Sequence, residues 1–111
     1  MTAATAQHDT IPTVTELTLW KKPVCPQCTG ASRWMDHHGL VYQEQELTAE
    51  ENFEQLKQFK SAGFAQAPII QFPEVRDGDE VLFEAQTVTG NRVDLIDAFA
   101  AATSKVSAIA A

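Results

Sequence analysis

Residues 16–39 read ELTLWKKPVCPQCTGASRWMDHHG, and this stretch decides the fold because it holds both cysteines of the chain between two periodic segments. The first five residues alternate in polarity, with Leu17 and Leu19 on one side and Thr18 and Trp20 on the other. Alternation of this kind, in residues that favour extended backbone, predicts a β-strand. The chain therefore reaches its cysteines at the end of a strand.

A helix is predicted directly after this strand. Pro26 suits the first helical position because its φ angle matches the helix and its missing N–H would have no partner there, which makes Cys25 the cap. Ala31 and Met35 follow at helical spacing, and Gly39 is a natural stop. The two cysteines thus fall where a strand ends and a helix begins.

A second strand and a second helix follow. Residues 40–47 alternate, and Thr48 with Glu51 has the spacing of a capping box for the next helix. Gly63 ends that helix. Its apolar stripe is predicted to consist of Phe53, Leu56 and Phe59, and the buried core to include Met35, Phe53, Leu56, Ile69 and Phe99.

The last part of the chain predicts two strands and a helix. Residues 68–72 form an apolar third strand, the Asp77-Gly78 pair supplies a turn, and residues 81–85 return as a fourth strand in a hairpin with the third. A final helix is expected from about Asn91. The order β-α-β-α-β-β-α predicts an α/β fold, a four-stranded mixed sheet flanked by three helices.

Composition limits the class of protein. The chain has 111 residues, 44% of them apolar and 21% charged, and a formal charge of −7. We expect one domain at residues 15–103, with tails at 1–14 and 104–111. The negative charge argues against binding nucleic acid. With neither an export signal nor an apolar run of about 18 residues, we expect a cytoplasmic protein that does not enter membranes.

The placement of the cysteines predicts redox chemistry. A thiol reacts as its thiolate, and the unpaired N–H groups and dipole at a helix N-terminus favour an anion. Cys25 lies at that terminus, with Lys22 nearby as a second source of positive potential, and Cys28 lies one turn in, on nearly the same face. We therefore predict that Cys25 is the nucleophile and that Cys28 resolves the mixed disulfide.

Two other uses of the cysteines are less favoured. A structural disulfide would close a loop of only a few residues and would be reduced in the cytosol. A zinc site would need His37 and His38, which lie two to three turns along the same predicted helix, too far from the cysteines for shared coordination. We expect neither a metal nor a cofactor beyond the redox-active Cys25–Cys28 disulfide.

Residues 16–102 resemble the glutaredoxin-like branch of the thioredoxin superfamily, and most closely the NrdH-redoxins. Four segments carry the resemblance, and they are CPQC at 25–28, RWMDHHGLVY at 33–42, GFAQAPII at 63–70 and TGNRVDLI at 89–96. The resemblance implies a thioredoxin-like fold. This chain differs from the usual NrdH pattern at residues 88–94, because the Trp, Phe and Pro of that pattern are absent here.

The resemblance also implies a substrate surface and partners. Pro68 would follow a cis peptide bond opposite the cysteines, and Gln66 and Ala67 would pair through their backbone with an extended substrate. NrdH-like proteins are reduced by thioredoxin reductase and supply electrons to ribonucleotide reductase, the enzyme of deoxyribonucleotide synthesis. We expect a monomeric electron carrier with these two partners.

Two alternatives stay open. The chain could be a glutaredoxin that depends on glutathione or another small thiol, with Lys22, the Ala67–Pro68 backbone and the Gly90-Asn91 helix start as its binding site. Thr89, Gly90 and Asn91 are predicted to contact a partner. It could also be a redox-inert interaction module on the same scaffold. Pro26 and Gln27, between the cysteines, are expected to influence the reduction potential.

Overall fold

A four-stranded mixed sheet forms the centre of the structure, a computed structural model that describes residues 11–110, with side chains as far as residue 106. The strand order is β2-β1-β3-β6, with β1 parallel to β2, β1 antiparallel to β3, and β3 antiparallel to β6. The strands are β1 (Thr18–Lys21), β2 (Gln43–Glu46), β3 (Ile69–Phe72) and β6 (Gln86–Thr89). The predicted mixed sheet of four strands with three flanking helices is confirmed.

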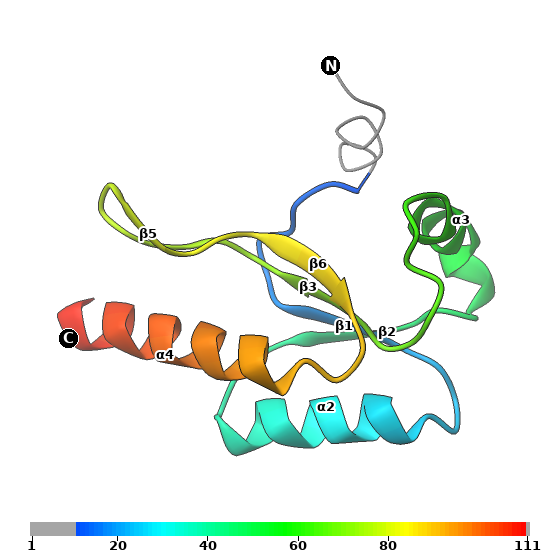
Figure 1. Cartoon of the computed structure of the whole chain (residues 1–111), viewed down its shortest axis with the longest axis horizontal. Coiled ribbons are helices and arrows are strands. Elements are labelled where there is room, and N and C mark those ends of the chain that lie inside the picture. Colours follow the sequence, from blue (N-terminus) through cyan, green and yellow to red (C-terminus); the bar gives the residue numbers. More distant parts are fainter. Residues whose placement is uncertain (1–10, 111) are drawn as a thin grey trace.

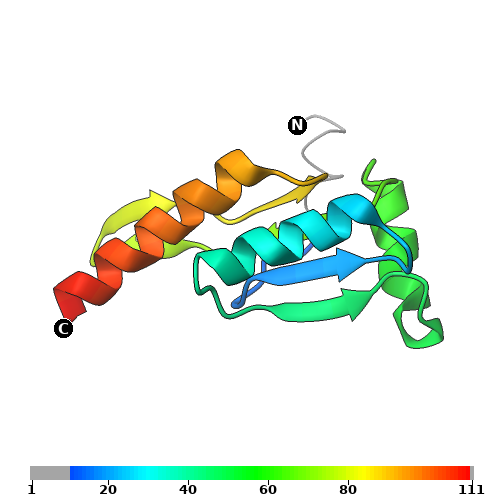
Figure 2. The same cartoon turned by 90° about the horizontal axis from the view of Figure 1, so that it is seen from below.

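The helices cover both faces of this sheet (Figure 1). Helices α2 (Pro26–His37) and α4 (Val93–Ala110) lie on one face, where Figure 2 shows them in front of the strands. The short 3₁₀ helix η1 (Glu50–Asn52) leads into α3 (Phe53–Ser61), which lies on the other face. No helix in residues 11–110 combines the length and the apolarity needed to cross a membrane.

The alternation of β1 and β3 divides the core between the two faces. Leu19 and Ile70 belong to the apolar cluster beneath α2 and α4, and Trp20 and Ile69 belong to the cluster beneath α3. Because all four side chains are buried, both central strands are covered on both sides. Burial of each Leu or Ile side chain contributes about 1.5–3 kcal/mol to the stability of the fold. These two strands therefore hold the layers together.

The prediction of the hairpin partner was wrong. The Asp77-Gly78 turn exists, but it joins β4 (Val75–Asp77) to β5 (Glu80–Phe83) in a separate two-stranded sheet. The strand that pairs with β3 is β6, whose sequence QTVT is polar and only half-buried at the sheet edge. The polar sequence of β6 does not predict a strand of the central sheet, whereas the apolar run at 81–85 resembles one.

The β4–β5 hairpin packs against α4 (Figure 1). The rings of Phe72, Phe83 and Phe99 meet there, with centroids 5.2–5.4 Å apart. Helix α4 continues past residue 103, the expected end of the domain, to Ala110, and Val106 packs against the core. The hairpin gives the later turns of α4 an apolar surface to cover, which a prediction from the helix alone could not include.

The start of α3 differs from the prediction in two ways. Thr48 forms no capping box, because Ala49 precedes η1 and the Thr48 hydroxyl donates instead to the Glu46 carboxylate, at 3.3 Å. Phe53 is 58% exposed, whereas Phe59 is fully buried. Steps of three residues fall short of a full helical turn by about 60° each, so a stripe spaced this way drifts around the helix and leaves its first member outside.

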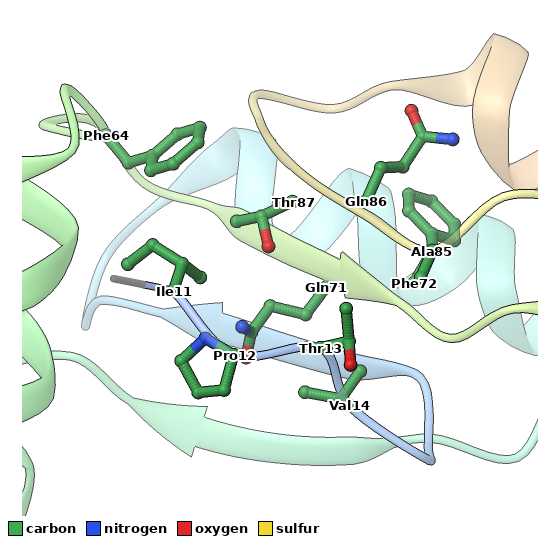
Figure 3. Close-up of a pocket in the computed structure, with 10 residues that line it drawn as sticks. All are labelled: Ile11, Pro12, Thr13, Val14, Phe64, Gln71, Phe72, Ala85, Gln86 and Thr87. Atoms are coloured by element: carbon green, nitrogen blue, oxygen red, sulfur yellow. The ribbon is translucent and has the colours of Figure 1, made fainter. Parts of the chain in front are cut away.

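The segment at residues 11–14, predicted to belong to a flexible tail, lies on the α3 side of the sheet (Figure 3). Ile11 packs against the cluster around Trp20 and Phe59, and the segment borders a hollow of about 260 Å³. On the same face the Trp20 indole N–H donates to Gln71 Oε1 at 2.8 Å, which satisfies a buried polar pair. The rest of the predicted tail, residues 1–10, lies outside the described residues.

The hairpin packing makes a testable prediction. Replacing Phe83 by alanine removes a ring that is 8% exposed and leaves a cavity against Phe72 and Phe99. We expect the free energy of unfolding to fall by about 3 kcal/mol or more, measured by denaturant titration. The control is Val81→Ala on the same strand, where the side chain is 38% exposed and the loss should stay below about 1 kcal/mol. A loss below about 1 kcal/mol for Phe83→Ala as well would mean that the hairpin does not belong to the core.

Helices α2 and α4 are joined by polar contacts as well. Asp97 Oδ1 accepts hydrogen bonds from the Trp34 indole N–H and from His38 Nε2, both at 2.7 Å. The hydrogen bond from Trp34, followed by that from His38, lowers the pKa of the Asp97 carboxyl below its ordinary value. Because both donors lie at the C-terminal end of α2, Asp97 holds this end of the helix against α4.

The Asp97 contacts predict a pH dependence of stability. A carboxyl whose pKa is lower in the folded state stabilises the fold above its unfolded pKa, about 3.9, and loses this contribution as the pH falls through the folded value. We expect Asp97→Asn to lower the Tm at pH 6 and the difference from the wild type to shrink at pH 3, measured by thermal unfolding. A difference of the same size at both pH values would contradict this.

Candidate redox site

Cys25 occupies the position that caps α2. Its backbone is extended, Pro26 is the first helical residue, and the backbone N–H of Cys28 donates to Cys25 Sγ at 3.2 Å. Cys25 and Cys28 form a disulfide, with their Cα atoms 5.2 Å apart. The Cys25 sulfur thus already accepts a hydrogen bond from the first turn, where a negative charge on the sulfur is favoured.

The two sulfurs differ in their accessibility. Cys25 is partly exposed, whereas Cys28 is 3% exposed and packs inside the first turn of α2. A partner sulfur can therefore reach Cys25 far more easily than Cys28. This is the geometry expected for an attacking and a resolving cysteine, and these two roles stay predictions.

All four strands of the sheet bring residues to the end at which Cys25 lies. The pairs Lys21↔Glu46 in the parallel β1–β2 ladder and Trp20↔Ile69 in the antiparallel β1–β3 ladder place the end of β2 and the start of β3 beside the end of β1. Because Ile69 also pairs with Thr89, the end of β6 lies there as well. Segments far apart in the sequence therefore surround Cys25.

Two hollows lie next to Cys25, and the first of them lies between the cysteine loop, residues 22–27, and the segment before β3. The Ala67–Pro68 peptide bond is cis, and Pro68 is buried, with its carbonyl accepting a hydrogen bond from the N–H of Gly90 at 2.9 Å. The hollow has a volume of about 410 Å³. It brings together the predicted site residues Lys22, Cys25, Pro26, Gln27, Gln66 and Ala67.

The predicted Thr89-Gly90-Asn91 turn lies beside the first turns of α2 rather than in either hollow next to Cys25. An added Cβ on Gly90 would lie 3.9 Å from Gln27 Oε1, and one on Gly30 would lie 2.9 Å from Asn91 Nδ2. The Asn91 amide thus fills the space that the missing side chain of Gly30 leaves. The turn supports α2, and its predicted contact with a partner stays a prediction.

A second hollow, of about 500 Å³, lies on the other side of Cys25, towards β2. Its charged residues are Lys21, Lys22, Arg33, Glu44 and Glu46. Lys21 is paired with Glu44 at 3.0 Å. This hollow was not predicted from the sequence, although the parallel pairing of two strands joined by the cysteine helix was a usable signal for it.

Val24 lines both hollows and was also missed. Its φ angle is +52°, and among residues 11–110 it is the only non-glycine residue with a positive φ. A left-handed backbone costs an ordinary residue about 1–2 kcal/mol, and a β-branched side chain is especially unusual there. The side chain is fully exposed. Nothing in the residue type predicts this conformation.

The two histidines lie at the far end of α2. His38 contacts Asp97, and the ring of His37 stacks on Trp34 with centroids 5.0 Å apart. In the part of the chain that the structure describes, no three His, Cys, Asp or Glu side chains are grouped so that they could hold a metal ion. His38 thus belongs to the contact between α2 and α4, and His37 packs on Trp34 beside it.

Comparison with known proteins agrees with this geometry. The family model described as Glutaredoxin matches residues 17–80, more than half of the chain. The chain belongs to the glutaredoxin family. The match includes both cysteines, Pro68 and the strands that bring them together, so this glutaredoxin is a thiol-disulfide protein whose CxxC cysteines form a disulfide.

One solved structure shows the same thioredoxin-like fold. It is the glutaredoxin-like protein NrdH-redoxin from Escherichia coli, described as having a thioredoxin-like activity profile. The two chains are 22% identical, with a TM-score of 0.55, over 73% of this glutaredoxin and 90% of NrdH-redoxin. A comparison with curated proteins found no match.

The contact between Gly30 and Asn91 predicts a coupled effect on stability. Replacing glycine by alanine inside a helix raises the free energy of unfolding by up to about 1 kcal/mol. At Gly30, however, the added Cβ would meet the Asn91 amide. We expect Gly30→Ala to stabilise the protein more in an Asn91→Ala background than in the wild type, measured by denaturant titration of all four proteins. If the two substitutions are additive, the amide does not restrict this position.

Proposed function

We propose that this glutaredoxin is a dithiol electron donor of the NrdH-redoxin kind, which reduces disulfides in partner proteins. The observation that carries the proposal is the Cys25 sulfur. It is partly exposed between two hollows and already accepts a hydrogen bond from the N–H of Cys28 at the start of α2. A sulfur in this place is accessible to a second protein and favoured as a thiolate.

The reaction transfers two electrons. In the reduced protein the Cys25 thiolate attacks one sulfur of the partner disulfide, which forms a Cys25–partner disulfide and releases the other partner sulfur as a thiolate. The Cys28 thiol then loses its proton to solvent and attacks Cys25 Sγ, which forms the Cys25–Cys28 disulfide and releases the second partner thiolate. The partner thiolates take up two protons, so the partner is reduced and this protein is oxidised.

We propose thioredoxin reductase as the reductant and ribonucleotide reductase as the acceptor. The support is the likeness in fold to NrdH-redoxin, a glutaredoxin-like protein described as thioredoxin-like in activity, together with the GFAQAP segment at 63–68. This segment includes Gln66 and Ala67 beside the first hollow, where the backbone of a substrate would lie.

A second candidate is a glutaredoxin that is reduced by glutathione or another small thiol. Lys22 favours it, because this residue lines the first hollow and its positive charge would attract a carboxylate of such a thiol. Membership of the glutaredoxin family is compatible with both candidates. They differ in the reductant, which an assay can identify.

The deciding experiment follows NADPH oxidation with a disulfide substrate. One reaction contains thioredoxin reductase, and the other contains glutathione with glutathione reductase. We expect turnover with thioredoxin reductase alone. Turnover only with glutathione would assign the protein to the second candidate, and turnover in neither reaction would favour an inert module.

The cysteine variants are the controls for this assay. Cys25→Ser should abolish turnover and form no mixed disulfide, because the accessible sulfur is gone. Cys28→Ser should also abolish dithiol turnover but should accumulate a mixed disulfide through Cys25, detected by mass spectrometry without reductant. Activity in Cys25→Ser would show that the nucleophile is assigned to the wrong cysteine.

A further inference from the structure

Val24 combines two features that do not help the folded chain by itself. Its side chain is 100% exposed, the largest exposure among the large hydrophobic residues described, and its φ angle is +52°. A glycine at this position would adopt the same backbone without strain and would expose no apolar surface. Strained residues of this kind persist where the surrounding structure holds them, and they gather at functional sites.

The place of Val24 connects it with the redox reaction. It immediately precedes Cys25 and lines both hollows, so it lies between them. Pro23 stands before it and Pro26 follows Cys25, so two rigid residues limit the motion of the loop. The exposed side chain is therefore held at a defined position beside the sulfur that a partner must reach.

The rim of the first hollow extends this apolar surface. Pro23, Val24 and Pro26 line it on the cysteine side, and Ala65 and Ala67 line it on the opposite side. A partner whose sulfur is bonded to Cys25 must cover part of this rim, because Val24 is the neighbouring residue. Apolar surface here is thus removed from water only during the reaction.

We propose that Val24 determines specificity for protein disulfides by packing against an apolar surface beside the partner's reactive cysteine. This inference rests on the proposed reduction of disulfides in partner proteins and names the residue that recognises such a partner. A small thiol lying in the hollow leaves the outward side of Val24 in water. A folded partner has a surface on either side of its disulfide and covers the whole side chain.

The test compares two substrates with the fully reduced protein. Insulin supplies a protein disulfide, and bis(2-hydroxyethyl) disulfide supplies a small one. The second-order rate constant for each is measured by acid quenching and separation of the oxidised form. The quantity of interest is the ratio of the insulin rate constant to the small-disulfide rate constant, because changes in the reactivity of Cys25 affect both.

Three variants are compared with the wild type. Val24→Asn keeps a side chain of similar size that tolerates the left-handed backbone but is polar, and Val24→Leu keeps the apolar character. Val41→Asn is the matched control, because Val41 is 86% exposed in a loop and lines neither hollow next to Cys25. Thermal unfolding of each variant shows that it is folded.

We expect Val24→Asn to lower the ratio about tenfold, a factor that corresponds to about 1.4 kcal/mol and to the low end of what burial of a valine contributes. Val24→Leu and Val41→Asn should keep the wild-type ratio. An unchanged ratio in Val24→Asn, or an equal fall in Val41→Asn, overturns the inference. If the wild type reduced neither of the two substrates, the proposed function would be overturned instead.

Discussion

The burial of β1 between β2 and β3 is the constraint on which the rest of the structure depends. With Leu19 packed under α2 and α4 and Trp20 packed under α3, this strand has neither a free face nor a free edge. The residues that follow Lys21, the last residue of β1, are therefore the first that can reach the surface. Four residues later Cys25 caps α2. The same strand sets the registers that bring the start of β3 and the end of β2 to this point, so the redox site follows from the packing of the core.

Local signals predicted the cysteine site well because the residues that form it act locally. Pro26 starts a helix through its own φ angle, and Gly39 ends one at φ +69°. The pairing of strands is different. The Asp77-Gly78 turn was visible in the sequence, but a turn says only that the chain reverses and not which strands it joins. The partner of β3 proved to be the polar strand β6, at an edge where few side chains are fully buried.

Other features were not predictable because they depend on the surrounding structure. The packing of the later turns of α4 depends on the β4–β5 hairpin, a separate sheet that the sequence did not predict. The left-handed backbone of Val24 has no signal in its residue type, which favours extended structure. It is set where the end of β1 must meet the start of α2. Most of the residues that lie next to Cys25 were therefore predicted as site residues, but the shape of the surface that they form was not.

The charge around the site differs from that of the whole chain. The protein carries −7 overall, yet three of its eight Lys and Arg residues, Lys21, Lys22 and Arg33, line the second hollow. Lys21 is paired with Glu44, and among residues 11–110 the ion pairs include neither Lys22 nor Arg33. Glu44 and Glu46 line the same hollow, so the excess there is one positive charge, and positive charge close to Cys25 favours its thiolate.

In a protein that donates electrons, the thiolate of the attacking cysteine must be stabilised only moderately. A thiolate that is held too strongly makes the reduced form the more stable one, and the protein then oxidises its partners instead of reducing them. In the first turn of α2, Pro26 has no N–H to offer, and the hydrogen bond to Cys25 Sγ comes from Cys28. The cap thus orients the sulfur and supports its charge while keeping the number of donors small. Val24 acts on a different quantity, because an apolar contact made only with a bound partner strengthens the encounter without changing the relative stability of dithiol and disulfide.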